Sequence, residues 1–531
     1  MTTVREATYA LLRSWGVTTV FGNPGSNELP FLAGFPGDLT YVLGLHEGAV
    51  LAMADGYAQA TGRPAFVNLH SAAGLGNAVG NLANAAAAHT PLVVTAGQQA
   101  RAMIGLGSVL AEPRMTRVPE PQVKWSAEPA RAQDVPGTLA QAFGLAALPP
   151  RGPVFVSLPL DDWAAEVVPS EVEHLAGRRV AAVGGAPAPL LARLATRLAA
   201  AAHPVLVVGP EVDEPGVFED VVTLSERCGL PVWIAPTPPR CPFPTDHPHF
   251  RGVLPASIAG VSGALAGHDL VLVLGAPVFR YHAYRPGPYL PPGASLVAVT
   301  SDPDEAARAP MGDAVVGDVA QIARQLLGAF TAGPRAIAPR QPVSRVDAGE
   351  APFPVAAVFD AMARVLPSRT VYVSESTSNT PVFWDRVPMN RPGSYYFPAA
   401  GGLGFGLPAA IGIQLAVPDR PVVAVLGDGA VQYAVSALWT AVRYGLPVTF
   451  VVLRNDSYGA LKWFASHLGA ADLPGLDLPG IDAVTIARGY GMAAERAVTV
   501  DRLAALLEKA PARGGPLLVE VPIVPETYLA G

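Results

Sequence analysis

Short apolar runs alternate with alanine-rich, helix-like patterns along the whole chain, and this alternation restricts the possible fold more than any other feature. Strands separated by helical segments are typical of βαβ units, which build parallel sheets. With about 150 residues per domain, a chain of 531 residues is long enough for three or four domains. We expect strands at Thr18–Gly22, Thr40–Leu45, Pro64–His70, Pro91–Gly97, Pro153–Leu158, Val205–Gly209, Pro231–Ala235, Asp269–Gly275, Ser295–Thr300, Thr370–Ser374, Val422–Leu426, Thr449–Leu453 and Leu517–Val521.

Two polar or proline-rich segments divide these strands into three groups. One lies around 169–185, and the other, at 331–352, has the composition of a linker. We therefore predict an α/β protein with three doubly wound parallel-sheet domains. Their predicted limits are 1–170, 186–330 and 353–531, with 331–352 as a linker.

Charge and cysteine content exclude several classes of protein. The net charge of −7 argues against nucleic acid as a partner, because nucleic-acid-binding domains carry a basic stripe. Two cysteines provide neither a disulfide framework nor a metal-ligand cluster. The chain starts without a secretory signal pattern. We expect a soluble cytoplasmic protein.

Two stretches, 64–100 and 392–418, contain no Asp, Glu, Lys or Arg. A membrane span needs about 20 consecutive, mostly apolar residues. The first stretch contains several Asn and His residues, and the second is interrupted by Gly and Pro. Neither therefore predicts a membrane span, and we expect both stretches to line buried interfaces.

The most specific local pattern lies in the last third of the chain. Gly427-Asp428-Gly429 follows an apolar strand, a helix-like stretch covers Tyr433–Tyr444, and Asn455 ends the next strand. Ligands of open α/β sheets bind at this carboxyl edge. A carboxylate, an amide oxygen and the backbone carbonyl of Ser457 suit Mg²⁺, with phosphate oxygens completing its shell. The alternative is a simple Gly-Asp-Gly turn, with Asn455 capping a loop.

Three polar residues follow expected strands near the amino terminus. Ser26, Glu47 and His70 would lie at one sheet edge and could converge. Each also has an ordinary explanation: an N-cap for Ser26, a first-turn acid for Glu47 and a hydrogen-bonded core histidine for His70. His282 follows another apolar strand and is uninformative alone. The Gly-rich run 401–406 does not fit a dinucleotide-binding spacing.

Longer motifs extend these patterns. Gly427-Asp-Gly with Asn455 matches the thiamin diphosphate motif, and the chain closely resembles the benzoylformate decarboxylases, a branch of the thiamin diphosphate-dependent 2-keto acid decarboxylase family. The resemblance covers nearly the whole chain. It rests on Phe21-Gly-Asn-Pro-Gly-Ser-Asn-Glu28, Asn68-Leu-His-Ser-Ala-Ala-Gly74, Gly275-Ala-Pro-Val-Phe-Arg-Tyr-His282, Gly393-Ser-Tyr-Tyr-Phe397 and Tyr458-Gly-Ala-Leu.

The resemblance implies a pyrimidine-binding domain, a central domain without cofactor and a diphosphate-binding domain. It also implies a homotetramer whose active sites are shared between subunits, and the charge-free stretches would fit such interfaces. Thiamin diphosphate and Mg²⁺ are the implied cofactors. A small 2-keto acid, benzoylformate, is the implied substrate, decarboxylated to benzaldehyde and CO₂ with aldehyde carboligation as a side activity. Mandelate catabolism is the implied pathway.

The resemblance also implies residue roles. Glu47 would bind the aminopyrimidine ring, the Gly401 carbonyl would receive its amino group, and Leu403 would hold the cofactor in its bent form. His70 and His282 would be acid/base groups, and Ser26 would hold the substrate carboxylate. The remaining cofactor residues would be Asn23, Pro24, Gly25, Thr377, Ser378, Asp428, Gly429, Ala430 and Tyr458, with Asp428, Asn455 and Ser457 on the metal. The substrate would also contact Leu110, Thr377, Phe397, Leu461, Phe464 and Leu476.

Two positions depart from the family pattern. Arg454 stands where a second asparagine is common, and Ala430 replaces a residue that usually carries a hydroxyl. The loss of one cofactor hydrogen bond at Ala430 would cost on the order of 1 kcal/mol. Neither change removes a metal-binding side chain.

Other functions remain open from the sequence. A carboligase or acyloin lyase, or a decarboxylase of another 2-keto acid, would use the same scaffold, since one methylene in an apolar pocket changes discrimination by only about 1–3 kcal/mol. A nucleotide- or flavin-binding protein would use the central domain, and its flavin form would be yellow when purified. The combination of His70, His282 and Ser26 favours decarboxylation.

Overall fold

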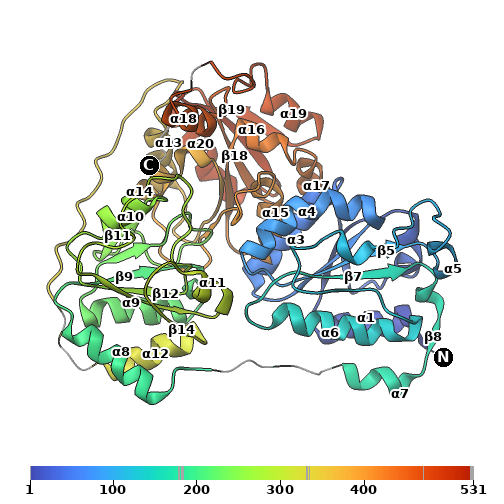
Figure 1. Ribbon diagram of the computed structural model, residues 1–531. Helices are drawn as coiled ribbons and strands as arrows, with labels where there is room; N and C mark the ends of the chain where they lie inside the picture. The colour runs from blue at the N-terminus through green and yellow to red at the C-terminus, as the bar shows by residue number, and fades with distance from the viewer. Residues whose placement is uncertain are drawn as a thin grey trace.

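The computed structural model contains three parallel six-stranded sheets, each covered by helices. It describes residues 2–526 apart from 177–179, 181–183, 331–332, 334 and 471. The three domains form a triangle, with the amino-terminal domain in blue, the central domain in green and yellow, and the carboxyl-terminal domain in orange and red (Figure 1). The predicted fold class is therefore confirmed.

The amino-terminal sheet has the strand order β3-β2-β4-β5-β7-β6. Its four inner strands are buried on both faces, which explains their nearly continuous apolar sequences. A short antiparallel pair joins the start of the chain to the end of this domain. The strands are β1 (Thr2–Thr3), β2 (Thr19–Asn23), β3 (Thr40–Leu43), β4 (Ala65–Leu69), β5 (Leu92–Gln98), β6 (Ser126–Ala127), β7 (Val154–Pro159) and β8 (Glu166–Val167). The helices are α1 (Val4–Ser14), α2 (Leu29–Leu32), α3 (Glu47–Thr61), α4 (Ser71–Ala87), α5 (Arg101–Ile104), α6 (Val135–Ala147) and α7 (Pro169–Val172).

The central sheet has the order β11-β10-β9-β12-β13-β14, again with parallel pairing throughout. Its strands are β9 (Pro204–Val208), β10 (Val232–Ile234), β11 (Phe250–Val253), β12 (Leu270–Leu274), β13 (Ser295–Thr300) and β14 (Asp313–Val316). Its helices are α8 (Ala188–Ala200), α9 (Val217–Cys228), α10 (Ile258–Ala264), α11 (Pro303–Arg308) and α12 (Val319–Ala329).

The carboxyl-terminal sheet has the order β16-β15-β17-β18-β20-β19. Its strands are β15 (Val371–Glu375), β16 (Tyr395–Tyr396), β17 (Val422–Gly427), β18 (Val448–Arg454), β19 (Ala493–Arg496) and β20 (Leu517–Pro522). Its helices are α13 (Val355–Val365), α14 (Thr380–Arg386), α15 (Gly406–Ala416), α16 (Asp428–Gln432), α17 (Ala437–Arg443), α18 (Gly459–His467), α19 (Ala483–Gly489) and α20 (Val500–Lys509).

The helix expected at Tyr433–Tyr444 differs from the observed one. Helix α16 already begins at Asp428, and a tight turn at 433–436 separates it from α17. In this turn the Tyr433 and Ala434 N–H groups donate to carbonyls three residues earlier, which interrupts the α-helical hydrogen-bond ladder. The prediction of one continuous helix was therefore wrong, and Asp428 is the first residue of a helix rather than part of a preceding loop.

The segment expected as a linker runs beside the central domain. Among its described residues, 335–349 form no helix or strand. Arg335 donates to the carbonyls of Leu198, Cys228 and Ala201, and Arg251 donates to Ala338. The segment is therefore held to the central domain by hydrogen bonds, while the domain limits themselves stay predictions.

Helices α3 and α15 pack closely and join the amino- and carboxyl-terminal domains. A Cβ atom on Gly412 would lie 1.8 Å from the Met53 carbonyl oxygen, and one on Gly56 would lie 2.4 Å from the Ala409 carbonyl oxygen. Later residues of α3 thus face earlier residues of α15, so the two helices run antiparallel. One charge-free stretch, 392–418, is explained here, because it contains α15 and buries it against α3 within the chain.

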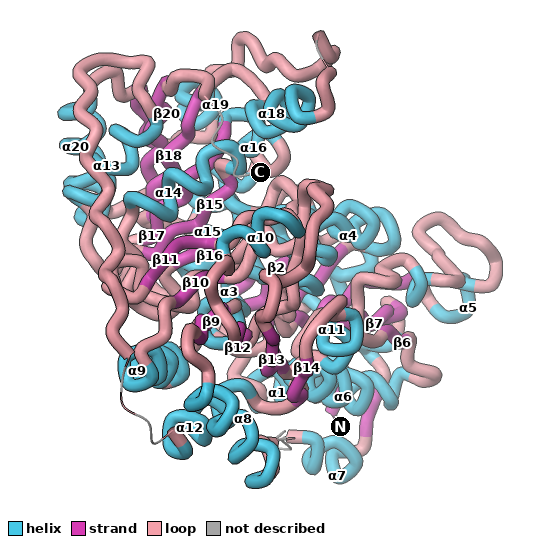
Figure 2. The backbone as a smooth tube through the Cα atoms, turned by 60° about the vertical axis from the view of Figure 1, so that its left-hand side comes forward, coloured by secondary structure: helices cyan, strands magenta, loops and turns pink. Residues whose placement is uncertain are grey.

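None of the helices in the described part of the chain has both the length and the apolar content required to cross a bilayer. The tube view in Figure 2 also shows the loop that follows α5 projecting from the amino-terminal domain. This loop carries Leu106 and Val109, whose side chains are 77% and 83% exposed.

Candidate active site

Glu47 begins α3 immediately after β3 and is almost completely buried. Its carboxylate oxygens accept hydrogen bonds from the side-chain amides of Asn23 (3.1 Å) and Asn77 (3.0 Å). A Cβ atom on Gly74 would lie 3.0 Å from the Glu47 side chain, so α4 approaches it closely. The structure thus brings the predicted Asn23 and Glu47 together and orients the carboxylate firmly. Asn77 was not predicted from the sequence.

His70 lies between the end of β4 and the start of α4, and its ring is oriented by Glu28. The distance from His70 Nδ1 to Glu28 Oε2 is 2.8 Å. Glu28 is buried, and its carboxylate also accepts the N–H groups of Gly25 and Gly97. Because a carboxylate accepts hydrogen bonds, we assign the hydrogen of this contact to Nδ1 of His70.

Pro24, Gly25 and Ser26 form the turn beside this histidine. A Cβ atom on Gly25 would lie 2.1 Å from His70 Nδ1, so only glycine allows the turn to approach the ring. Ser26 follows directly and is exposed, and its hydroxyl donates to Asn27 Oδ1 at 3.4 Å. The predicted Ser26, Glu47 and His70 therefore belong to one edge of the amino-terminal sheet.

Glu28→Gln should lower the turnover number about 10- to 100-fold, which is part of what a general acid/base group contributes. The two Glu28 oxygens accept three donors, and the glutamine amide would turn one of these contacts into a donor facing a donor. The measurement is steady-state kinetics beside a thermal unfolding curve. A turnover number within threefold of the wild type would show that Glu28 does not orient His70.

Asp428 joins β17 to α16 at the carboxyl edge of its sheet. One carboxylate oxygen accepts the Gly429 N–H at 2.8 Å, and the other accepts the N–H groups of Asn455 (3.1 Å) and Asp456 (2.7 Å). Burial raises the pKa of the Asp428 carboxyl, although these three N–H groups favour its charged form. Asn455 Oδ1 accepts the Ser457 N–H at 3.2 Å, so the predicted metal-binding residues form one cluster.

The predicted diphosphate residues surround this cluster. A Cβ atom on Gly429 would lie 2.7 Å from the Tyr458 ring, and one on Gly459 would lie 2.9 Å from the Ser378 hydroxyl. Thr377 precedes Ser378 in a short 3₁₀ helix after β15. The glycines thus allow close packing of Ser378, Asn455 and Tyr458 around Asp428.

The donor set at this edge fits Mg²⁺ and a diphosphate. The Asp428 carboxylate, the Asn455 amide oxygen and the Ser457 carbonyl are hard oxygen ligands of the kind that Mg²⁺ prefers. Arg454 takes no part, since its guanidinium pairs with Asp456 (2.8 Å) and Glu520 (3.4 Å). Ala430 is buried beside Asp428 and provides no hydroxyl.

The predicted substrate-binding residues fall into two groups. His282 lies in the loop after β12, and its ring centroid is 4.7 Å from that of Phe464 on α18, which also carries Leu461. The Tyr458 N–H donates to the Leu476 carbonyl, and the Phe397 N–H donates to the Pro239 carbonyl. These residues belong to the half of the site that carries the predicted metal ligands Asp428 and Asn455. Leu110 belongs instead to the amino-terminal domain, in the loop that follows α5.

The lengths of α4 and of the α3–α15 pair allow an estimate of how far Glu47 lies from the Gly401 and Asp428 side of the site within one chain. Asn77 on α4 binds Glu47, whereas Asn84, seven residues later on the same helix, binds the Gly402 backbone. At 1.5 Å per residue, these two contacts lie about 10 Å apart along α4. Along the antiparallel α3–α15 pair, Glu47 is about 18 Å from Gly406 by the same rise. Gly406 binds Glu375, the last residue of β15, at the sheet edge that carries Asp428.

Sequence reasoning missed two buried glutamates that support this site. Glu28 orients His70, and Glu375 accepts the N–H groups of Gly404, Phe405 and Gly406. Burial raises the pKa of Glu375 to about 7, although these N–H groups oppose the shift. The signal available was a single acid in an apolar context: Glu28 closes the Phe21–Glu28 motif, and Glu375 ends a buried strand.

Comparison with protein families places this arrangement in a class. Residues 376–521 match the C-terminal TPP-binding domain of thiamine pyrophosphate enzymes, residues 2–120 match their N-terminal TPP-binding domain, and residues 191–326 match their central domain. The chain therefore belongs to the thiamine pyrophosphate enzymes.

Individual relatives indicate a smaller group within the thiamine pyrophosphate enzymes. The chain is 55% identical to the benzoylformate decarboxylase of Pseudomonas aeruginosa over 98% of this chain and 99% of that protein. It also superimposes on two solved structures, each with a TM-score of 0.95. One is the thiamine diphosphate-dependent 4-hydroxybenzoylformate decarboxylase of Rhodococcus jostii RHA1 (50% identity, 98% of this chain and 99% of that chain). The other is the benzoylformate decarboxylase of Polynucleobacter necessarius (39% identity, 99% and 100%). The expected resemblance is confirmed, and with it the enzyme class, a thiamin diphosphate-dependent carboxy-lyase.

Proposed function

We propose that this protein decarboxylates benzoylformate to benzaldehyde and CO₂, with thiamin diphosphate held by Mg²⁺. The observation that carries the proposal is the 55% identity to a benzoylformate decarboxylase along almost the entire chain. Two groups of residues, each at the edge of a sheet, support it. One contains the buried acids Glu28 and Glu47 with His70, and the other contains the oxygen ligands expected for Mg²⁺. The assignments of individual residues are part of the proposal.

The chain's own residues would divide the work between the two halves. Asp428, Asn455 and Ser457 would hold Mg²⁺, while Thr377, Ser378, Gly429 and Tyr458 would contact the diphosphate. Bound thiamin diphosphate supplies the carbon nucleophile and accepts the electron pair that CO₂ leaves behind. The Glu47 carboxylate, held by Asn23 and Asn77, would hydrogen-bond the aminopyrimidine ring.

Proton transfer and substrate orientation would fall to three polar side chains. His70 and His282 would deliver and remove protons at the reacting oxygen and carbon, and Ser26 would hold the substrate carboxylate. Glu28 fixes which His70 nitrogen carries hydrogen. Leu110, Phe397, Leu461, Phe464 and Leu476 would form an apolar wall suited to an aromatic ring.

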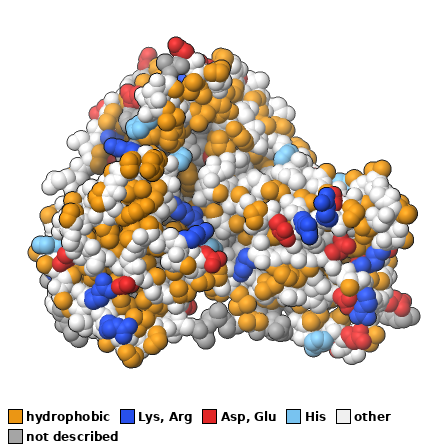
Figure 3. Space-filling view, in the orientation of Figure 1, with side chains coloured by type: hydrophobic (Ala, Val, Ile, Leu, Met, Phe, Trp, Pro, Cys, Tyr) orange, Lys and Arg blue, Asp and Glu red, His pale blue; other side chains and the backbone are white. Residues whose placement is uncertain are grey.

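We propose that a complete site is shared between two chains. Glu47 and Gly401 are expected to bind the same pyrimidine ring, yet within one chain the α4 contacts of Glu47 and of the Gly402 backbone lie about 10 Å apart, and Glu47 lies about 18 Å from Gly406 along the α3–α15 pair. Large exposed apolar side chains also occur in the segments that carry expected substrate residues: Leu106, Val109, Tyr284 and Leu461. Figure 3 shows hydrophobic side chains gathered over the central domain in the region of α10. Such patches are typical of protein interfaces. Shared sites in a homotetramer explain both observations.

Mixed assemblies test the shared site directly. Chains with Glu47→Gln and chains with Asp428→Ala are each expected to be almost inactive. When the two are co-expressed with different tags and purified through both tags, each mixed pair should regain one intact site. About half of the wild-type activity per pair is expected. Failure to regain activity in a doubly purified assembly would contradict the sharing of sites.

A substrate panel tests the reaction and the pocket together. Aldehyde release would be measured from benzoylformate, 4-hydroxybenzoylformate, phenylpyruvate and pyruvate, with and without thiamin diphosphate and Mg²⁺. Cofactor-dependent benzaldehyde, with benzoylformate the best substrate, is expected. A different best substrate would keep the reaction and change the pocket assignment. No aldehyde from any acid, with cofactor bound, would favour a carboligase, for which aldehyde coupling would be measured next.

A further inference from the structure

Arg280 connects all three domains from a position two residues before His282. Its guanidinium pairs with Glu305 of the central domain at 2.8 Å. It also donates to the Ala87 carbonyl at the end of α4 (3.3 Å) and to the Ala399 carbonyl of the carboxyl-terminal domain (3.5 Å). Figure 3 shows basic and acidic side chains meeting at the junction between the central and amino-terminal domains.

Both backbone partners of Arg280 are connected to the loop that carries the expected cofactor residues Gly401 and Leu403. Ala399 lies in the loop that leads to Gly401 and Leu403, and Asn84 holds the same loop by accepting the Ala400 and Gly402 N–H groups. Ala87 ends the helix that carries Asn84. Arg280 therefore links the loop of His282 directly to the loop of Gly401, two segments that are more than a hundred residues apart in the chain.

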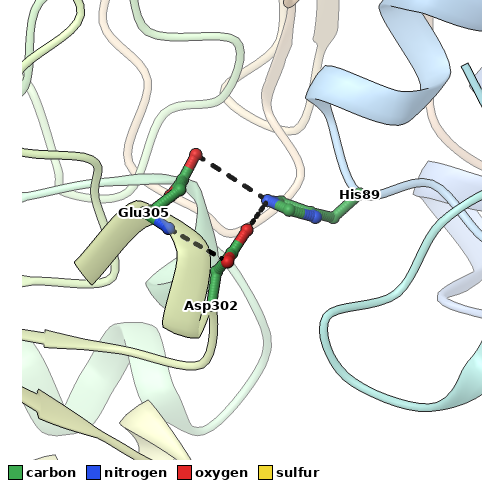
Figure 4. Close-up of side chains that lie close together, drawn as sticks. All are labelled: His89, Asp302 and Glu305. Atoms are coloured by element: carbon green, nitrogen blue, oxygen red, sulfur yellow. Dashed lines mark hydrogen bonds and ion pairs between the residues drawn. The ribbon is translucent and has the colours of Figure 1, made fainter. Parts of the chain in front are cut away.

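A charged cluster holds Arg280 in place through Glu305 (Figure 4). Glu305 lies on α11 and Asp302 caps that helix, while His89 approaches from the amino-terminal domain. His89 Nε2 is 3.5 Å from Asp302 Oδ2 and 4.0 Å from Glu305 Oε1, and its Nδ1 is 3.2 Å from the Arg151 carbonyl oxygen. With Nδ1 bonded to a carbonyl, an unprotonated Nε2 would face two carboxylates without a cation between them.

The charges of this cluster balance when His89 is protonated. Arg280 and His89 then offset Glu305 and Asp302, and a third acid, Glu211, is already bonded by Thr300 and Ser301. A His and two acids also resemble a metal site. Here, however, the Glu305 oxygen nearest His89 is the one paired with Arg280. A proton on His89 is therefore the cation that the cluster accommodates.

We propose that Arg280 is a positioning residue that fixes the His282 loop against the Gly401–Leu403 loop, and that the pair with Glu305 holds Arg280 in this position. The proposal rests on the roles of His282, Gly401 and Leu403 in the proposed function. It makes Arg280 a residue that acts through others, since within the described part of the chain its guanidinium bonds only to Glu305 and to two backbone carbonyls.

The test compares Arg280→Gln with a matched control in the full-length protein loaded with thiamin diphosphate and Mg²⁺. Arg197→Gln is the control, because Arg197 is also in the central domain, forms an ion pair of 2.8 Å with Asp313 and is similarly exposed (38% against 33%). Arg280→Gln should lower kcat about tenfold or more, with KM for the 2-keto acid changed less than threefold. Arg280→Lys keeps the charge but cannot reach all three partners, so its kcat should lie between the values for Arg280→Gln and Arg197→Gln.

Hydrogen exchange provides a reading that does not depend on turnover. Peptides covering 276–286 and 397–405 should exchange faster in Arg280→Gln than in the wild type, and Arg197→Gln should leave them unchanged. Unchanged exchange in both loops, or an unchanged kcat, would overturn the proposal. If Arg280→Gln does not fold, Glu305→Gln tests the same link while retaining the arginine. A wild type without decarboxylase activity would instead overturn the proposed function, and the exchange comparison would still stand.

The same cluster predicts a pH dependence of stability. Burial opposes the charge on His89, but Glu305, Asp302 and Glu211 outweigh it and raise the pKa of His89. A raised folded-state pKa stabilises the protein below the ordinary histidine value of about 6.5, and the gain is lost as the pH rises through the folded-state value. His89→Gln should therefore lower the thermal unfolding midpoint in mildly acidic buffer and matter progressively less at alkaline pH.

His268→Gln is the control for this pH dependence. His268 Nδ1 also lies near a backbone carbonyl, that of His203 at 3.0 Å. The effect of His268→Gln on the unfolding midpoint should not become smaller from acidic to alkaline buffer, as the effect of His89→Gln should. A difference between the wild type and His89→Gln that stays constant from acidic to alkaline buffer would show that His89 does not join the domains as a cation.

Discussion

Replacing Glu47 with glutamine should lower the turnover number by at least about a hundredfold, the lower part of the range for an acid/base group. The substitution keeps the size of the side chain but removes the charge that Asn23 and Asn77 orient in a nearly dry environment. A neutral amide cannot stabilise a charged or tautomeric form of the aminopyrimidine as a carboxylate does. Steady-state kinetics at saturating thiamin diphosphate and Mg²⁺ measures the loss.

Asp55→Asn is a control from the same helix. Asp55 is also a buried carboxylate on α3, and it accepts hydrogen bonds from Gln59 (2.8 Å) and Thr90 (2.7 Å). Burial raises its pKa to about 6, although both donors oppose the shift. Because Asp55 lies two turns beyond Glu47, Asp55→Asn should change thermal stability and leave turnover largely intact. Equal losses in both variants would remove the special role of Glu47.

Asp428→Ala should weaken Mg²⁺-dependent binding of thiamin diphosphate by at least about a hundredfold, or about 2.7 kcal/mol. It removes the only carboxylate of the predicted ligand set and leaves the N–H groups of Gly429, Asn455 and Asp456 without their acceptor. Titration calorimetry with thiamin diphosphate, with and without Mg²⁺, measures the change. Unchanged affinity in the presence of Mg²⁺ would contradict the metal assignment.

The neighbouring Asp456→Asn is the matched control for Asp428→Ala. The Asp456 side chain pairs with Arg454 rather than with the predicted ligands, and asparagine tolerates its positive φ of 53°. It should bind cofactor nearly as well as the wild type. Since burial raises the pKa of Asp428, and a metal ligand must be deprotonated, cofactor retention in the wild type should fall as the pH is lowered.

The long inner strands could be predicted because burial on both faces makes them continuously apolar. Thus β12 and β18 follow the apolar runs at 269–275 and 449–453 closely. Short edge strands were missed: β6 and β16 contain two residues each, and β19 has the partly polar sequence AAER. Such segments form strands only because a neighbouring strand offers hydrogen bonds, and this information is not local.

The predicted site followed from one rule, that polar residues after parallel strands share an edge. This rule placed Ser26, Glu47 and His70 in one domain and Asp428 and Asn455 in another. It could not find the partners that orient them, because Glu28 lies 42 residues before His70 and Glu305 lies 25 residues after Arg280. It also could not show that the α3–α15 packing separates the two halves.

The antiparallel α3–α15 pair has a consequence for mixtures of normal and defective chains. If each chain contributes one half to each of two sites, a lesion confined to one half inactivates only the site that uses that half. Activity should then decline in direct proportion to the fraction of defective chains. A chain that is defective in both halves would inactivate both sites of every pair that contains it. Activity would then fall with the square of the fraction of normal chains. If the sites are shared in this way, the place of a defect in the chain, in one half or in both, would determine how strongly a defective chain lowers the activity of a mixture.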